Sequence, residues 1–170
     1  MTSSGLSRLA GHWELDPDKT SVAFRTKAMW VLPIKGTAKA LSGDAQVNPD
    51  AAATKGTLVI DATSFDTKNK RRDDHLRSQD FLEVAKYPSI IFTADGGRQT
   101  SASRVEITGM LAIHGKTRPL TLQAELAESG HAATVSTLVQ IDRPLWGVSK
   151  WSKMGAGLIQ VEIRAHFDRT

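Results

Sequence analysis

The stretch VEITGMLAIHGKTRPLTLQAEL, from Val105 to Leu126, shows the pattern on which the fold prediction rests. Apolar residues occupy every second position from Val105 to Ile113 and again from Leu120 to Leu126. Strict alternation is typical of strands that bury one face and leave the other in water. Between the two halves, His114-Gly115-Lys116 has the composition of a turn. The stretch therefore predicts two strands of an antiparallel sheet.

The same alternation recurs on both sides of this stretch. It is found in Ser21–Arg25, Gly56–Asp61, Ile90–Ala94, Ala133–Ile141 and Ile159–Phe167, and more weakly in Trp13–Asp16 and Lys35–Val47. Turn-forming residues separate these segments, so we expect about eight or nine strands, which suit either a sandwich or a closed barrel. Without a repeat or a linker, the chain is predicted to be one domain over residues 1–170, with residues 1–12 as a flexible tail.

Composition places the chain among globular proteins and excludes several kinds of site. Its 170 residues are 40% apolar and 24% charged, as in an ordinary soluble domain. The sequence contains no apolar run long enough for a transmembrane helix and no leader-like start, so we expect a cytoplasmic protein without a membrane span. With no cysteine, disulfides, thiolate metal sites and a cysteine nucleophile are excluded.

The charge is mildly basic, at +4, and much of the local bias lies in the run Lys68–Arg72. Such a run can contact nucleic acid or phosphate groups, or it can be a solvated loop. Nucleic-acid interfaces usually interleave aromatic residues with the charge, and this run has none. We therefore predict no nucleic-acid partner.

The segment Arg71–Phe92 breaks the alternation with a charged, helix-like sequence. It predicts two short helical turns, the first capped by Asp73 or Asp74 and the second by Asp80. Pro88 is expected to end the segment, because it disfavours helical geometry in the residue before it. Helices this short are not stable alone, so we expect them to dock as a cap on the open end of a barrel.

Several motifs in order resemble the YceI-like, polyisoprenoid-binding family. They are Trp13–Asp16, Lys19–Phe24, Thr63–Thr67, Arg72–Ser78, Asp80–Leu82, Lys86–Pro88, Gly109–Leu120 and Ile141–Arg143 with Trp146–Val148. The resemblance runs from about Trp13 to Phe167. It implies an all-β fold, a single antiparallel, roughly eight-stranded lipocalin-like barrel with the helical insert capping one end, and an apolar bore that holds a long isoprenoid chain.

The resemblance also implies a set of ligand-binding side chains on the apolar faces and in the irregular segments. They are Val22, Phe24, Trp30, Leu58, Ile60, Phe81, Ile90, Phe92, Ile107, Leu111, Leu122, Val139, Trp146, Val161 and Ile163. The Trp-rich segments 29–34 and 146–154 suit a gate, a seal for the barrel end or a homodimer interface. A possible head-group rim is Lys68, Lys70, Arg71 and Arg72, which would attract a phosphorylated head group.

Evidence for catalysis in the sequence is thin. The five histidines show no HxxxH or HxH spacing, and no serine lies in a Gly-x-Ser-x-Gly turn. His75 beside Asp73 and Asp74 suits either an acid–base group or a structural residue. We predict no metal, no cofactor and no enzymatic activity, but non-catalytic binding of a long apolar molecule for storage, transport or sequestration. The alternatives are an enzyme acting on a hydrophobic substrate and a dry barrel that serves as a protein-interaction module.

Overall fold

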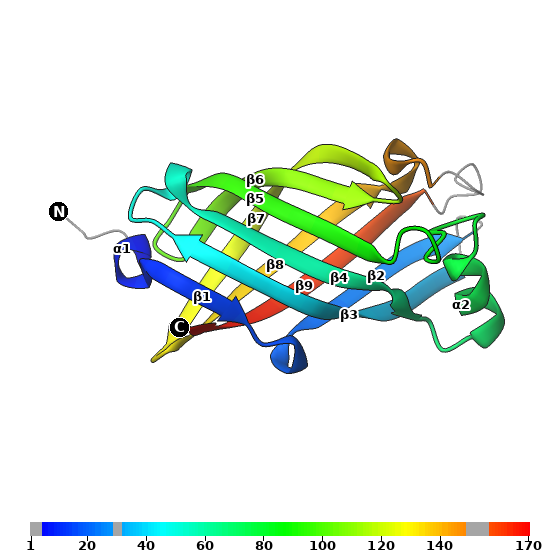
Figure 1. The fold of residues 1–170 in the computed structure, drawn as a ribbon, viewed down its shortest axis with the longest axis horizontal. Coiled ribbons are helices and arrows are strands. Elements are labelled where there is room, and N and C mark those ends of the chain that lie inside the picture. Colours follow the sequence, from blue (N-terminus) through cyan, green and yellow to red (C-terminus); the bar gives the residue numbers. More distant parts are fainter. Residues whose placement is uncertain (1–4, 29–31, 149–156) are drawn as a thin grey trace.

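The protein is an antiparallel β-barrel that is longer than it is wide (Figure 1). The computed structural model describes residues 5–28, 32–148 and 157–170, and the side chains of residues 7–27, 33–148 and 157–170. Its strands are β1 Gly11–Leu15, β2 Ser21–Ala28, β3 Leu32–Val47, β4 Lys55–Asp66, β5 Ser89–Gln99, β6 Arg104–Ile113, β7 Lys116–Ser129, β8 Ala132–Asp142 and β9 Leu158–Arg169. Its helical elements are α1 Gly5–Leu9, η1 Pro17–Lys19, η2 Ala51–Ala53, α2 Lys70–Arg77 and η3 Arg143–Trp146. The all-β prediction is confirmed.

The barrel closes because β3 pairs with both β2 and β4. Eight strands, β2 to β9, form the closed ring, and β1 lies beside β3 and β9 in line with β2. A single turn of η1 separates β1 from β2: Pro17 opens it, and the side chain of Asp16 accepts a hydrogen bond from the backbone of Asp18. The predicted barrel is therefore confirmed, and the sandwich alternative is wrong.

The strand pair β6–β7 has the register that the opening stretch predicts. Val105 lies opposite Ala124, and Ile113 lies opposite Lys116 at the turn. His114 and Gly115 make that turn with positive φ angles of 56° and 74°. A Cβ atom on Gly115 would approach the Tyr87 ring to 2.5 Å, so the turn needs a glycine for space as well as for its backbone conformation.

The segment after β4 covers one end of the barrel, as expected, but its local structure differs from the prediction. Asn69 caps α2 by accepting a hydrogen bond from the Arg72 amide, so the expected cap at Asp73 or Asp74 is wrong. Asp73 is 6% exposed and accepts hydrogen bonds from the Thr67 amide and hydroxyl. A buried carboxylate needs such partners, which explains why Asp73 faces the protein and leaves the cap to Asn69.

The second predicted helical turn does not form. Residues 78–88 make a series of turns, in which the Leu82 amide donates to the Leu76 carbonyl and the Val84 amide to the Arg77 carbonyl. Asp80 caps no helix; its carboxylate lies 3.3 Å from Nε2 of His75. The apolar residues of the segment do dock as expected, since Phe81 is 8% exposed and Val84 packs against the main core cluster.

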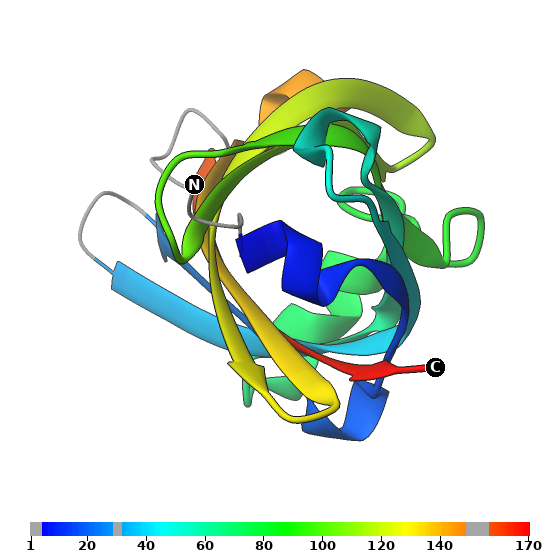
Figure 2. The ribbon, with the colours of Figure 1, turned by 90° about the vertical axis from the view of Figure 1, so that its left-hand side faces the viewer.

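The opposite end of the barrel is crossed by α1 (Figure 2). Leu9 at the end of α1 is 7% exposed and packs with Trp13 and Ala133. Trp13 is 2% exposed, its indole N–H donates to the Leu9 carbonyl at 2.8 Å, and the Arg169 guanidinium lies 4.4 Å from its ring centre. Within residues 1–12, which we expected to form a flexible tail, residues 5–9 thus form α1, and Gly11 and His12 begin β1.

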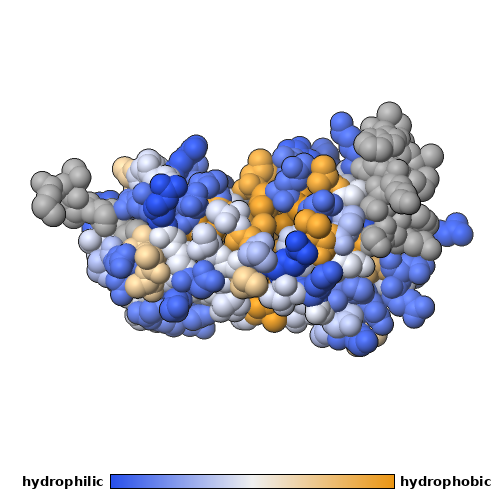
Figure 3. Space-filling model, turned by 90° about the horizontal axis from the view of Figure 1, so that it is seen from above, coloured by the Kyte–Doolittle hydropathy of each residue, from blue (hydrophilic) through white to orange (hydrophobic). Residues whose placement is uncertain are grey.

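The outer wall is mostly polar but carries some apolar residues. They gather near the middle of the face seen in Figure 3. Met110 of β6 is 38% exposed and lies opposite Pro119 of β7. Exposed apolar groups often mark contacts with other molecules, and a homodimer stays a prediction. No helix within the described ranges is both long enough and apolar enough to cross a membrane.

Candidate binding cavity

The bore of the barrel holds a cavity of about 630 Å³ at the end covered by α2. This volume lies within the range of about 300–1,000 Å³ that is typical of small-molecule sites. Strands all around the barrel contribute apolar side chains to the cavity wall, because the alternating pattern directs one face of each strand inward. The bore is therefore not filled by its own side chains, as a dry barrel would be.

Most of the predicted ligand-binding residues line this cavity. They are Val22, Phe24, Leu58, Ile60, Phe81, Ile90, Phe92, Leu111, Leu122, Val139, Val161 and Ile163. Ile107 lines a second cavity, nearer α1. Trp146 borders neither: it is 4% exposed and its indole N–H donates to the Leu111 carbonyl at 2.8 Å, which makes it a packed part of the wall. Trp30 lies outside the described residues, as do residues 29–31 of the predicted segment 29–34 and residues 149–154 of the predicted segment 146–154.

The polar residues that line the large cavity lie toward its α2 end. They are Thr26, Arg72, His75 and Arg143. None of the described residues that line this cavity is Asp or Glu. The cavity thus has an apolar interior and one end rich in hydrogen-bond donors, which is the polarity that an amphipathic molecule with an accepting or anionic head group requires.

Arg143 is the most buried of these polar residues, at 6% exposed. One of its guanidinium nitrogens donates to the Val148 carbonyl at 2.6 Å, and the guanidinium carbon lies 5.3 Å from the Phe81 ring centre. Burial lowers the pKa of Arg143, and the neighbouring Asp142 opposes that change. Because an arginine side chain does not lose its proton in proteins, Arg143 places a positive charge at the cavity wall.

Arg72 and His75 reach the cavity from α2. Arg72 donates from Nε to the Thr67 hydroxyl at 2.8 Å and from a terminal nitrogen to the Thr67 carbonyl at 2.9 Å. Asp73 holds Thr67 in turn, so the direction of Arg72 is set by a buried network. The His75 ring meets the Phe81 ring edge-on at 5.0 Å. Phe81 therefore lies against both His75 and Arg143 and brings these two side chains into one group.

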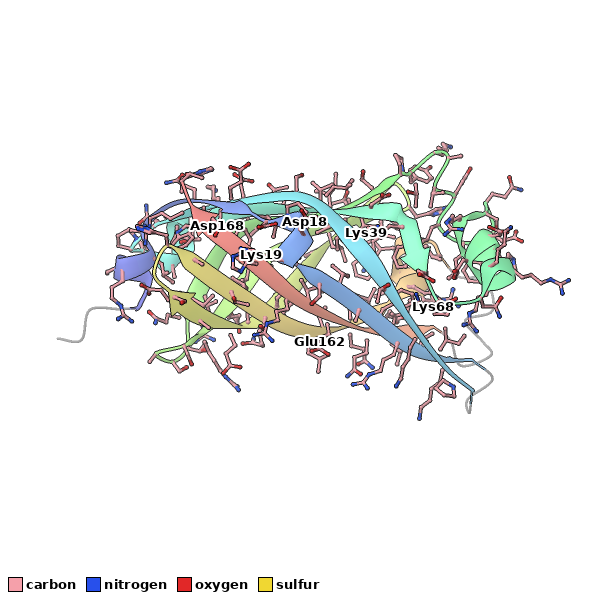
Figure 4. The ribbon with its side chains drawn as sticks, turned by 90° about the horizontal axis from the view of Figure 1, so that it is seen from below. Asp18, Lys19, Lys39, Lys68, Glu162 and Asp168 are labelled. Carbon is pink, nitrogen blue, oxygen red and sulfur yellow. The ribbon has the colours of Figure 1, made fainter. Side chains whose placement is uncertain are left out.

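The other residues of the predicted head-group rim lie elsewhere. Lys68 borders a separate groove of about 390 Å³ on the outer wall, on the face that also carries Lys39 and Glu162 (Figure 4). The side chain of Lys70 is 90% exposed and pairs with Asp74 at 3.0 Å, and Arg71 is exposed. Of the four cations, the structure places only Arg72 at the cavity.

Sequence reasoning missed Arg143 as a site residue. A signal was present, because Arg143 follows Asp142 at the end of β8 and stands directly before the apolar sequence Pro144-Leu145-Trp146. A cation in such a context is buried only where partners or a ligand compensate for it. Thr26 carried no such signal, since threonine is common on both faces of strands.

A second cavity of about 180 Å³ lies in the bore on the α1 side of the first. Leu9 and Trp13 border it at the α1 end, and Val105 and Ile107 contribute from β6. The linings of the two cavities have four side chains in common: Leu58, Phe92, Leu122 and Ile163. The bore thus holds a large chamber near α2 and a small chamber near α1, which adjoin at these four side chains. No group of three or more potential metal-binding side chains occurs within residues 5–28, 32–148 and 157–170.

Comparisons with known proteins agree with this architecture. The family model of the YceI-like domain matches residues 13–168. The chain is 37% identical over 135 residues to the protein YceI of Escherichia coli O157:H7, covering 76% of this chain and 69% of that protein. It is 31% identical over 146 residues to a UPF0312 protein of Vibrio parahaemolyticus, covering 79% of this chain and 77% of the relative.

Two solved structures have the same fold at low sequence identity. Burkholderia cenocepacia BcnA superposes with a TM-score of 0.82 at 24% identity, covering 89% of this chain and 98% of the other. A polyisoprenoid binding domain from Saccharophagus degradans, described as implicated in plant cell wall breakdown, gives a TM-score of 0.77 at 16% identity, covering 93% and 98%. At these identities the likeness shows the fold.

Proposed function

The chain belongs to the YceI-like domain family, and from this premise we propose that it binds a long apolar molecule of the isoprenoid class inside its barrel, without catalysing a reaction on it. The observation that carries the proposal is the apolar chamber of about 630 Å³ inside the bore. The description of the Saccharophagus degradans domain as polyisoprenoid binding supports the ligand class.

The chamber suits an apolar chain energetically. Each methylene group that leaves water contributes about 0.8 kcal/mol, so a chain of many carbons binds without a specific polar contact. Because the inner wall is made almost entirely of aliphatic and aromatic side chains, little desolvation of polar protein groups opposes that gain. Storage, transport or sequestration of such a chain is the role that follows.

The polar end of the chamber supports one orientation of the ligand. Arg72, His75 and Arg143 would bind the head group near α2, and the apolar chain would extend along the bore toward α1. The absence of Asp and Glu among the described lining residues favours a head group that accepts hydrogen bonds or carries negative charge, such as a phosphate. A cationic head group would meet like charge there.

The test is native mass spectrometry of the freshly purified protein, followed by solvent extraction and identification of the released molecule. We expect a stoichiometric isoprenoid. Val161→Trp, which fills the chamber from β9, should prevent its retention, whereas Leu138→Trp on the outer wall, where Leu138 is 53% exposed, should not. A folded protein that carries no lipid and takes up no added polyprenyl ligand would overturn the proposal.

One observation favours an enzyme as the second candidate. Nε2 of His75 lies 3.3 Å from the Asp80 carboxylate, and His75 borders the chamber. A histidine oriented by a carboxylate is a common acid–base arrangement. This candidate requires turnover of a hydrophobic substrate that depends on pH and is lost in His75→Ala. Retention of a bound isoprenoid by His75→Ala, with no product formed by the wild-type protein, would exclude it.

A further inference from the structure

We propose that Leu58, Phe92, Leu122 and Ile163 form a partition across the bore that sets the length of the chain the protein accepts. The inference rests on the proposed function, since it concerns the apolar ligand of the same bore. These four side chains are the ones that both chambers share. They come from β4, β5, β7 and β9, so they reach the axis of the barrel from different sides.

Packing supports the view that the four side chains form one layer. Leu58 lies directly opposite Phe92 in the β4–β5 register. Leu58 and Ile163 each pack against two separate core clusters, one around Val22 and one around Leu15. Leu122 is 9% exposed. The layer is therefore the place where the packing at the α2 end meets the packing at the α1 end.

Phe92 is the largest member of the layer, and a glycine on the neighbouring strand makes room for its ring. A Cβ atom on Gly109 of β6 would lie 2.8 Å from the tip of the Phe92 ring. The ring thus lies over the backbone of β6 at a place where any other residue would collide with it. An aromatic ring held against a neighbouring strand has little freedom to move aside for a ligand.

The chamber volumes translate into chain lengths. Benzene, with six carbons, occupies an apolar cavity of about 150 Å³. On that scale the large chamber of about 630 Å³ holds about 25 carbons, or about five isoprene units. The small chamber of about 180 Å³ adds about seven carbons. With the partition in place, a chain of four or five units should fit the large chamber, and a longer chain needs both chambers.

The experiment compares the binding of a C20 and a C30 isoprenoid alcohol to the wild-type protein and to partition variants. The wild-type protein should prefer the C20 alcohol. Phe92→Ala and Leu122→Ala join the chambers, so the ratio of C30 to C20 affinity should rise about tenfold or more. Leu122→Phe thickens the layer and should lower that ratio. Ile90→Ala is the matched control, because Ile90 lines the large chamber and not the small one. The substitution enlarges the large chamber without opening the partition.

The outcomes separate this inference from the proposed function. If the wild-type protein binds neither alcohol, the proposed function is wrong, and the inference of a length-setting partition is wrong as well. If it binds both and the ratio in Phe92→Ala and Phe92→Leu equals the ratio in Ile90→Ala, the protein is a carrier without a partition. Phe92→Leu retains an apolar side chain at the site, so the ratio of C30 to C20 affinity can be measured in this variant even if Phe92→Ala does not fold.

Discussion

Glu83 and His114 meet at the α2 end of the barrel, and both residues have a positive φ angle. The Glu83 carboxylate lies 3.5 Å from Nε2 of His114, and their φ angles are 49° and 56°. Nε2 of His114 is buried and has no hydrogen-bond partner among the described residues. Positive φ is costly for residues other than glycine. The contact therefore joins two costly backbone positions, one in the turns of residues 78–88 and one in the β6–β7 turn.

From this contact we predict that Glu83 stabilises the packing of the turns of residues 78–88 against the barrel. Glu83→Gln removes the charge that faces His114, so the segment should open more often. Hydrogen exchange at the amides of Leu82 and Val84 should become several-fold faster, in line with a loss of up to about 1 kcal/mol for a partly exposed ion pair. Lys86→Gln, an exposed change in the same segment, should leave these rates unchanged. Equal exchange in the wild-type protein and Glu83→Gln would contradict the prediction.

The two arginines at the polar end of the chamber should distinguish head groups. Arg72→Gln and Arg143→Gln should each weaken binding of an isoprenyl phosphate about tenfold more than binding of the matching alcohol, because a charge-assisted hydrogen bond is lost. The affinities are measured by titration calorimetry with ligands of equal chain length.

Lys70→Gln is the control for these variants, since its side chain is 90% exposed and paired with Asp74. It should change neither affinity by more than about twofold. Equal losses for phosphate and alcohol in the arginine variants would exclude an anionic head group at this end.

Trp13 should be a major contributor to stability at the α1 end. It is 2% exposed, and its indole N–H donates to the Leu9 carbonyl. Trp13→Ala should lower the free energy of unfolding by about 3–5 kcal/mol, because a large buried side chain leaves a cavity. Urea denaturation measures the loss. Leu138→Ala, at a position that is 53% exposed, should change the value by less than about 0.5 kcal/mol.

The stability of the protein against urea at acid pH should depend on Asp66. Hydrogen bonds from the Lys68 backbone amide and then from its side chain lower the pKa of Asp66. A carboxylate whose pKa is lower in the folded state stabilises the protein above its unfolded pKa, and that contribution is lost as pH falls through the folded pKa. In Asp66→Asn the urea midpoint should therefore fall less steeply below about pH 4.

Lys68→Gln tests the cause of that shift. Because the backbone amide of residue 68 is the largest contributor, the variant should retain most of the acid dependence of the wild-type protein. The effect of Asp66 is small, since the side chain is 44% exposed and solvent screens it. A profile of Lys68→Gln that coincides with that of Asp66→Asn would show that the side-chain ion pair dominates instead.

Much of the fold could be predicted because strand patterning is local. The alternation around Val105–Ile113 identifies the inward face of β6 from neighbouring residues alone. The structure of the helical insert, residues 71–92, was harder to predict, because tertiary contacts easily outweigh helix propensity and capping preferences in short helices. Aspartate is a common N-cap residue, but the Asp73 carboxylate accepts hydrogen bonds from the Thr67 hydroxyl and amide and does not cap the helix. No local rule predicts that competition.

The candidate site could be predicted only in part, for a related reason. Inward-facing residues such as Ile60 and Val139 follow from the alternation and do line the large chamber. The predicted rim followed from charge density along the chain, but Lys68 and Lys70 lie outside the cavity while Arg143, far along the sequence, borders it. Charge in a sequence does not indicate which cations the closed barrel directs inward.

The sequence by itself determined which residues face inward, because a period of two is a property of neighbouring positions. Only the tertiary structure decided the height of each residue along the bore, because that height depends on the stagger of strands around a closed barrel and on the bulges at which β3 shifts its pairing with β4. Closure places Phe92 and Ile163 at one level to divide the bore, and it brings Arg72 and Arg143 to the same end.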